Sequence, residues 1–193
     1  MTFEAKTTAL LVMDYQPAIL GSLEDSERLL DTARSLISTV RSKRGLVGFV
    51  RVGFTDEDYA GFPETSVMGN RVRGNRPGLD ADAPTSALHP ELASEVHPDD
   101  VVVRKTRVGA FSTTDLKRQL CDAGINTVLL AGVHTSGVLL TTVREAHDLD
   151  YNVVVVGDAC ADPDPAVHEF LLTNIVPKQG IVVTSSGVAG LLG

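Results

Sequence analysis

The stretch of residues 127–146 constrains the fold of this chain more than any other part of the sequence. It begins with an apolar run at 127–131 and breaks at Gly132. Beyond the break, apolar side chains recur at helical spacing: Leu139, Leu140, Val143 and Ala146. A buried run, a glycine turn and a periodic segment together predict a strand followed by a helix, with Thr135 or Ser136 as the N-cap.

The turn of this unit is a candidate binding site for an anion. The first amides of a helix have no internal partner and carry the positive end of the helix dipole. We therefore expect the backbone of the turn to hold an anion or a developing oxyanion. The residues of this candidate cradle are His134, Thr135, Ser136, Gly137 and Val138. The alternative is a purely structural connection, since every α/β protein has several such turns.

Strands and helices are expected to alternate along the rest of the chain. Further apolar runs predict strands at residues 7–13, 46–52, 101–103, 151–156 and 181–184. Helical spacing and capping residues predict helices at 23–44, 113–123 and 165–175, with a short one within 88–96. This order predicts an α/β three-layer sandwich, in which helices flank both faces of a mostly parallel six-stranded sheet. No linker or repeat interrupts it, so we expect residues 1–193 to form one domain.

Charge and composition narrow the class of partner. The net charge of −8 argues against nucleic acid and against an anionic membrane surface. No apolar run approaches the roughly 20 residues that a membrane helix needs, and the first residues do not resemble a signal peptide. The 2 cysteines make no disulfide framework. We therefore expect a cytoplasmic protein with a small-molecule substrate.

Two charged residues lie at the carboxyl ends of predicted strands. Asp14 comes after the strand at 7–13, and Lys105 comes after the strand at 101–103. In parallel sheets ligands bind outside the carboxyl ends of strands, so we expect these side chains and the Gly132 turn to lie close together. Such a pair can serve as a general acid or base and its electrostatic partner. The alternative for each is a plain surface role, because Asp is a common turn residue and Lys is often solvated.

The composition changes from residue 53 to about residue 85, where Gly, Pro, Asn and Asp dominate. A loop this long inside a compact domain is a lid, an interface arm or a disordered segment. Its aromatic and basic side chains favour a lid or an arm. Candidate substrate-binding residues here are Phe54, Arg71, Arg73 and Arg76, because aromatic groups line ligand sites and guanidinium groups bind carboxylates in bidentate geometry.

No motif for a metal ion, a phosphate or a cofactor is found in the sequence. The histidines have neither His-x-x-His nor His-Glu-x-x-His spacing. Glycine-rich phosphate loops and the Gly-x-Ser-x-Gly elbow are missing too. Cys121 and Cys160 are expected to be small core residues. We therefore expect a site that holds no metal and no cofactor.

Four segments together resemble the isochorismatase-like family, a superfamily that also holds nicotinamidases and other cysteine hydrolases. They are 10–16 (LLVMDYQ), 103–116 (VRKTRVGAFSTTDL), 130–138 (LAGVHTSGV) and 158–162 (DACAD). The resemblance implies a Rossmann-like strand order and a cis peptide bond between Val133 and His134. Gln16 and Phe111, which lie within two of these segments, are further candidate substrate-binding residues.

Most members of this family use an Asp–Lys–Cys triad, in which the Cys attacks an amide or a similar carbon. Asp14 and Lys105 match the first two positions, but Val138 stands where the pattern has Cys. Cys160 matches a structural segment of the family instead. Isochorismatases proper also lack the Cys, usually with Gly in its place. In them an acid equivalent to Asp14 protonates a vinyl ether carbon, and water completes the hydrolysis.

The residues and the resemblance predict a hydrolase that acts on a small carboxylated molecule through Asp14 and Lys105, without a Cys nucleophile. Its target would be a vinyl ether or a C–N bond. Two alternatives stay open: a family member without catalysis that serves as a small-molecule binding or oligomeric interaction protein, and an enzyme with Ser136 as nucleophile. We also expect a homo-oligomer, because the arm at 53–85 and the apolar tail at 188–192 could pack on a neighbour.

Overall fold

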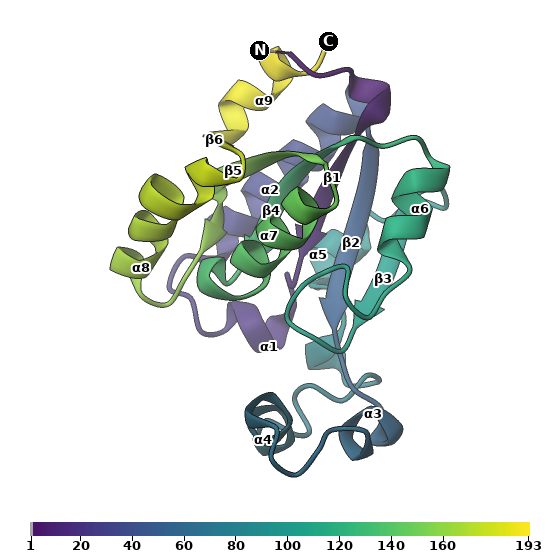
Figure 1. The fold of residues 1–193 in the computed structure, drawn as a ribbon, viewed down its shortest axis with the longest axis vertical. Coiled ribbons are helices and arrows are strands. Elements are labelled where there is room, and N and C mark those ends of the chain that lie inside the picture. Colours follow the sequence, from purple (N-terminus) through teal and green to yellow (C-terminus); the bar gives the residue numbers. More distant parts are fainter. Residues whose placement is uncertain (1) are drawn as a thin grey trace.

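The computed structural model describes residues 2–193, and within them one parallel sheet forms the centre of the molecule (Figure 1). Its strands are β1 Thr8–Met13, β2 Leu46–Val52, β3 Val101–Lys105, β4 Thr127–Val133, β5 Asn152–Ala161 and β6 Ile181–Val183. They lie side by side in the order β3-β2-β1-β4-β5-β6, and every neighbouring pair is parallel. This is the order of a Rossmann fold, which reverses direction between β1 and β4. The predicted fold class is confirmed.

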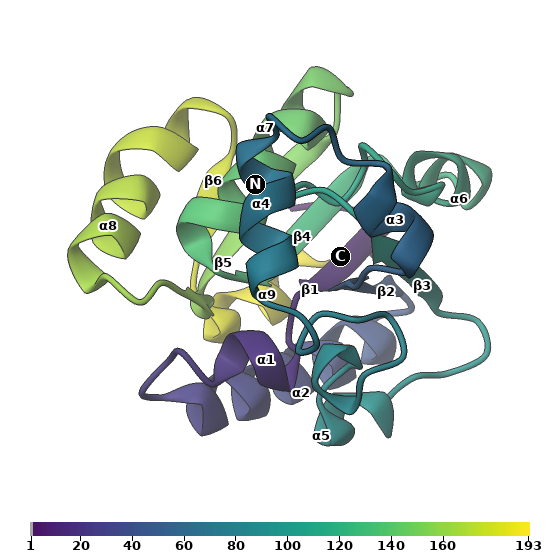
Figure 2. The same cartoon turned by 90° about the horizontal axis from the view of Figure 1, so that it is seen from below.

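Helices cover both faces of the sheet. One face carries α1 Pro17–Leu20, α2 Ser26–Ser42, α5 Pro90–Ala93 and α9 Ser185–Leu191; the other carries α6 Leu116–Asp122, α7 Leu140–Asp148 and α8 Pro165–Phe170 (Figure 2). Two further helices, α3 Asp56–Ala60 and α4 Val67–Gly74, lie beyond the carboxyl ends of the strands, at the end of the molecule away from both chain termini (Figure 1).

The sheet separates two apolar cores because successive side chains of a strand point to opposite faces. In β1, Leu10 and Val12 pack with α2, whereas Leu11 and Met13 pack with α6 and α7. All residues of β1 and of β4 are buried. These two central strands are therefore fixed from both sides, and they hold the residues at their carboxyl ends in place.

The turn after β4 differs from the prediction. A single π turn spans Thr135–Leu139, and Gly137 within it has non-helical backbone angles of φ −98 and ψ −107. His134 takes the N-cap position without a side-chain cap, and α7 begins only at Leu140. The prediction of a regular helix capped by Thr135 or Ser136 was wrong, because hydrogen bonds from outside the turn engage both residues.

The structure also shows how the segment 53–85 and the apolar tail at 188–192 pack on the rest of the chain. The segment 53–85 is not disordered, since α3 and α4 close on an apolar cluster of their own: Val52, Phe54, Tyr59, Phe62 and Val72. In the apolar tail, the side chains of Val188 and Leu192 are buried in the chain's own core. Among the described residues, no helix is both long and apolar enough to cross a lipid bilayer.

Candidate functional site

The predicted acid and the predicted turn meet where the strand order reverses. Asp14 follows β1 directly, and the peptide bond between Val133 and His134 at the end of β4 is cis, as the resemblance implied. Asp14 has a left-handed backbone with φ 61, which costs an L-residue of this kind about 1 kcal/mol. Its N–H donates to the carbonyl of Val50 at 2.8 Å. This crevice is the usual ligand site of a doubly wound sheet.

Asp14 and Lys105 form a buried ion pair. The Lys105 Nζ lies 2.8 Å from Asp14 Oδ2, and the two side chains are 2% and 7% exposed. The ammonium group also donates to the carbonyl oxygens of Arg107 at 3.2 Å and Val108 at 2.9 Å. Three acceptors therefore match its three N–H donors. The loop that follows β3 fixes this lysine in a single orientation.

The second oxygen of Asp14 has no partner. Oδ1 is buried, and no hydrogen bond reaches it from any residue between 2 and 193. Burial raises the pKa of the Asp14 carboxyl above its usual value, and the Lys105 ammonium offsets this only in part. A carboxyl group with a raised pKa and a free oxygen can carry a proton at this position and give it to a ligand.

A cavity of ≈ 760 Å³ lies above this pair. Its walls are largely apolar and come from α1, β2, α4 and the end of β4: Ile19, Val52, Phe54, Met68, Val72, Leu79, Val133 and Val138. A few polar side chains interrupt them: Ser22, Arg71, Asn75, Arg107 and His134. A pocket of this size with a few convergent polar groups suits a small organic ligand.

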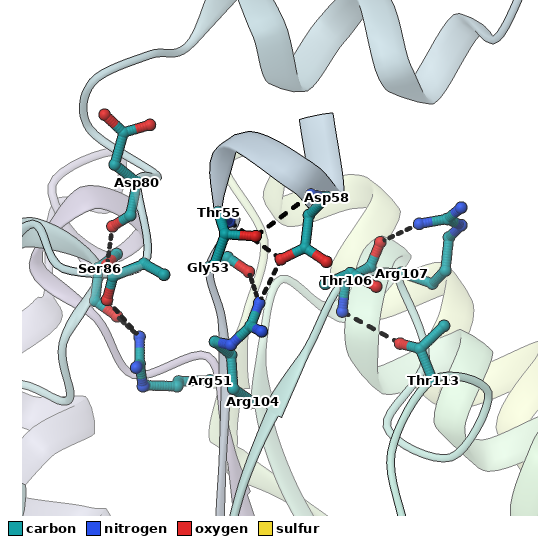
Figure 3. Close-up of polar contacts among 11 residues, drawn as sticks. Arg51, Gly53, Thr55, Asp58, Asp80, Ser86, Arg104, Thr106, Arg107 and Thr113 are labelled. Carbon is teal, nitrogen blue, oxygen red and sulfur yellow. Dashed lines mark hydrogen bonds and ion pairs between the residues drawn. The ribbon is translucent and has the colours of Figure 1, made fainter. Parts of the chain in front are cut away.

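The segment 53–85 covers the cavity as a roof. Figure 2 shows α4 in front of the carboxyl ends of β1 and β4. Ser66 caps α4 by accepting the N–H of Gly69 at 2.9 Å. The segment is tied to the strands below it: Arg104 donates to the Gly53 carbonyl at 2.8 Å and to Asp58 at 2.6 Å (Figure 3). These ties hold the first residues of the segment against β3.

The predicted arginines have different surroundings. Arg71 lines the cavity. Arg73 does not, because its guanidinium donates to the carbonyl oxygens of Tyr59 at 3.1 Å and Phe62 at 2.7 Å. Arg76 is paired with Asp56 at 2.5 Å and Asp80 at 3.1 Å and lies over the ring of Tyr59. Arg73 and Arg76 therefore hold the roof together and are not brought to the cavity.

Sequence reasoning missed Arg107. Its guanidinium lies 4.1 Å from the centre of the Phe62 ring and donates to the Thr106 carbonyl at 2.7 Å, and it also lines the cavity. Figure 3 shows it beside Thr106, whose N–H is held by Thr113. Within residues 2–193 no carboxylate pairs with Arg107. The sequence signal was its place two residues after Lys105, on the loop that follows a strand.

Of the other three candidate substrate-binding residues, only one lines the cavity. Phe54 lines the cavity. Gln16 lies behind it, where its side chain donates to the carbonyl oxygens of Val52 and Ser86 and accepts the Val52 N–H at 2.8 Å. Phe111 stacks on Tyr151 at 5.8 Å, outside the cavity lining. Gln16 is thus a brace between β1, β2 and the roof.

The candidate anion cradle is only partly available. His134, Gly137 and Val138 line the cavity, whereas Thr135 and Ser136 do not. The N–H of Ser136 donates to Asp162 Oδ2 at 2.8 Å. Burial opposes ionisation of Asp162, but the hydrogen bonds from Ser136 outweigh it and lower the pKa of that carboxyl. This amide already holds an anion of the protein itself, and Ser136 has no place at the cavity as a nucleophile.

Thr135 is tied to α8. Its hydroxyl lies 2.7 Å from His168 Nδ1. Burial lowers the pKa of the His168 imidazole, which favours its neutral form. Neither His168 nor Asp162 was expected at the site, since both come from the segment after β5 and only the folded chain brings them to the turn. Together they fix the turn from behind.

Neither cysteine reaches the cavity in the part of the chain that the structure describes. Val138 is 1% exposed and lines the cavity wall. Cys160 is buried in the core beneath, and burial raises the pKa of its thiol to about 12. Cys121 is exposed on α6. Across residues 2–193, no group of three His, Cys, Asp or Glu side chains is placed to hold a metal ion.

The fold and these side chains define an α/β protein with a buried Asp–Lys pair at the bottom of a cavity that a separate segment covers. Known proteins are similar to it in sequence and in structure. The isochorismatase domain model matches residues 8–187. The chain is 31% identical over 180 residues to the uncharacterized isochorismatase family protein YwoC of Bacillus subtilis, covering 93% of this chain and 91% of that protein. It is 30% identical over 189 residues to the phenazine biosynthesis protein PhzD1 of Pseudomonas aeruginosa, covering 97% and 87%.

A solved structure agrees with the sequence matches. An isochorismatase family protein from Burkholderia thailandensis superposes with a TM-score of 0.83 at 34% identity, covering 99% of this chain and 97% of that one. The chain therefore belongs to the isochorismatase family. The family assignment extends over nearly the whole sequence, including β1 with Asp14, β3 with Lys105 and the turn after β4.

Proposed function

We propose that this protein is a hydrolase of small carboxylated molecules that uses Asp14 and Lys105 for acid–base chemistry and water in place of a protein nucleophile. The observation that carries the proposal is the free, buried Oδ1 of Asp14 beside the cavity, on a carboxyl whose pKa burial raises. The presence of Val138 at the cavity wall supports a route without a thiol.

In the proposed reaction the protonated Asp14 gives its proton to the substrate. On a vinyl ether the proton goes to the terminal carbon, and on a C–N bond it goes to the leaving nitrogen. A water molecule supplies the hydroxyl group to the electrophilic carbon, so that one water is consumed for each bond broken. On a vinyl ether this addition gives a hemiketal, whose hydroxyl proton passes to the ether oxygen as the C–O bond breaks, so that an alcohol leaves and a carbonyl group remains. Lys105 then faces a full carboxylate at 2.8 Å and stabilises it until a proton returns.

The substrate's carboxylate would bind at the cavity wall formed by the roof and the loop after β3. Arg71 and Arg107 line this wall, and neither forms an ion pair within the described chain. Both guanidinium groups lack a carboxylate partner in the described chain, so two of them at one pocket favour an anionic ligand that they can bind in bidentate geometry. We expect Arg71→Met to raise KM with little change in kcat, since it would remove binding and not chemistry.

A second candidate function is binding without catalysis, in a small-molecule binding or oligomeric interaction protein. Val138 favours this function, because it gives the cavity an apolar wall with no nucleophile. Such a cavity can bind a ligand as well as one that carries a nucleophile, without reacting with it. In that case a ligand raises the melting temperature of the protein and is recovered unchanged.

The experiment that separates these functions is a hydrolysis screen of the purified protein and its Asp14→Asn variant. The panel holds carboxylated vinyl ethers, primary amides and thioesters. Asp31→Asn, at an exposed acid on α2, is the control. Turnover that Asp14→Asn abolishes and Asp31→Asn keeps would support the proposal. Turnover that survives in Asp14→Asn would refute the role of Asp14, and ligand-dependent stabilisation without turnover would favour the binding protein.

A further inference from the structure

Ser22 and His134 form a second polar pair at the cavity. Ser22 lies two residues beyond α1, and His134 follows β4. The Ser22 Oγ is 2.9 Å from His134 Nε2, and both residues line the same cavity as Asp14. This contact involves neither the Asp14–Lys105 pair nor the roof segment. A histidine placed beside a reaction site and held by a hydroxyl group has the arrangement of a positioned base.

The hydroxyl of Ser22 fixes which imidazole nitrogen carries the proton. Its Oγ donates to the carbonyl of Ile19 at 2.7 Å, three residues back along the chain. A hydroxyl has one proton, so toward His134 it can act only as acceptor. Nε2 of His134 is therefore the donor of the 2.9 Å bond and carries the hydrogen. In the neutral imidazole the lone pair then lies on Nδ1.

The Nδ1 atom of His134 is free. No residue between 2 and 193 forms a hydrogen bond with it, and it is not among the buried atoms without a partner, so water reaches it. The acids that act on this imidazole by charge are Asp14, from the end of β1, and Asp162, from beyond β5. The cations that line the same cavity are Arg71, Lys105 and Arg107.

We propose that His134 is a catalytic base of this site, which takes a proton from the attacking water on Nδ1, and that Ser22 is the positioning residue that fixes its tautomer. This inference rests on the proposed hydrolysis. Asp14 gives one proton to the substrate, and the water oxygen forms the new bond to carbon. The proton that this water loses goes to His134 Nδ1. Return of that proton to Asp14 through water restores both groups.

The tautomer is tested first, because its measurement needs no substrate. Nitrogen-15 NMR of uniformly labelled protein distinguishes a protonated from an unprotonated imidazole nitrogen, and the His134→Gln variant identifies the signal. We expect Nε2–H with an unprotonated Nδ1 in the wild type, and an equilibrium between both tautomers in Ser22→Ala. A wild-type His134 protonated on Nδ1 would overturn the proposal.

The kinetic test uses the compound of the hydrolysis panel that is turned over fastest. Gln can still donate to Ser22 but offers no base, so we expect His134→Gln to lower kcat by about 100-fold with little change in KM. Added imidazole should restore part of the activity of His134→Ala. His147→Gln, at an exposed histidine on α7, is the control.

Ser22 has a matched control as well. Ser94 at the end of α5 donates to the Glu91 carbonyl at 2.8 Å, which repeats the bond from Ser22 to Ile19 without an imidazole. Ser22→Ala should lower kcat about tenfold and Ser94→Ala should leave it unchanged. If Asp14→Asn is inactive while His134→Gln keeps the wild-type kcat, the role of His134 is refuted and the hydrolase remains. If Asp14→Asn is active, the proposed function itself fails.

Discussion

At the scale of single residues, the main electrostatic feature of the site is the buried ion pair of Asp14 and Lys105. Both side chains are removed from water. The free-energy cost of removing two charges from water can exceed the gain from their attraction. The hydrogen bonds from Lys105 to two carbonyl oxygens offset part of that cost, but Oδ1 of Asp14 receives none. The pair is therefore better suited to chemistry than to stability, and its protonation should be visible in the stability of the protein.

We predict that Asp14→Asn gains stability relative to the wild type as the pH rises from about 4. The Asp14 carboxyl of the unfolded chain has its usual pKa of 3.8, and burial raises the pKa in the folded state. The folded protein thus holds this proton more tightly. The stability that the protonated carboxyl contributes is fully present below pH 3.8 and is lost as the pH rises through the folded pKa.

Calorimetric melting of both proteins between pH 4 and pH 8 measures this difference. All other titrating groups are common to the two proteins, so the pH dependence of the gap in melting temperature belongs to Asp14. A gap that stays constant over the whole range would show that the pKa of this carboxyl is not raised.

The sequence predicted Asp14 and Lys105 because each lies at the carboxyl end of an apolar run, and the carboxyl ends of parallel strands meet. It did not predict Asp162 or His168, because their contact with the turn depends on how β5 and α8 return to β4. Arg73, in contrast, was predicted at the site but does not line the cavity. Composition could not tell a guanidinium that faces a ligand from one that binds two carbonyl oxygens of its own segment.

At the scale of elements, the roof and the turn are where the chain departs from regular structure. The turn after β4 was predicted from helical spacing, which is present in its apolar side chains but not in the backbone at Gly137. The strands β1 and β2 were predicted with nearly correct bounds because burial on both faces leaves a plain apolar run. The end of β5 was not, since this strand continues to Ala161, beyond the predicted end at residue 156. The helices of the roof were missed, since α3 and α4 are short and pack mainly on each other.

Arg73 links α4 to the rest of the roof, and we predict that Arg73→Met loosens this helix. The change keeps the length of the side chain but leaves the carbonyl oxygen of Phe62 without its side-chain donor and removes one donor from the carbonyl oxygen of Tyr59. An unpaired buried acceptor costs about 1–3 kcal/mol. Hydrogen exchange of the α4 amides should therefore quicken about tenfold. Arg71→Met, on the same helix, removes neither bond and should leave exchange unchanged; equal effects of both variants would contradict the structural role of Arg73.

At the scale of the whole molecule, the two chain ends close the core at the end opposite the site (Figure 1). The N–H of Phe3 donates to the Leu191 carbonyl at 2.7 Å, and the N–H of Gly193 donates to the Phe3 carbonyl at 2.9 Å. The α9 helix packs on α2 through the buried Val188. This end of the molecule contributes backbone hydrogen bonds and apolar packing away from the cavity.

We predict that Val188→Ala lowers the free energy of unfolding by about 2 kcal/mol, because it removes two buried carbon atoms and leaves a cavity between α9 and α2. Urea unfolding measures the loss as a shift of the midpoint at constant slope. Val67→Ala is the control, since Val67 is 83% exposed on α4 and its loss should change stability by less than about 0.5 kcal/mol. If Val188 instead served contacts between copies of the chain, Val188→Ala would lower the molar mass measured by light scattering and leave the unfolding midpoint of the monomer unchanged.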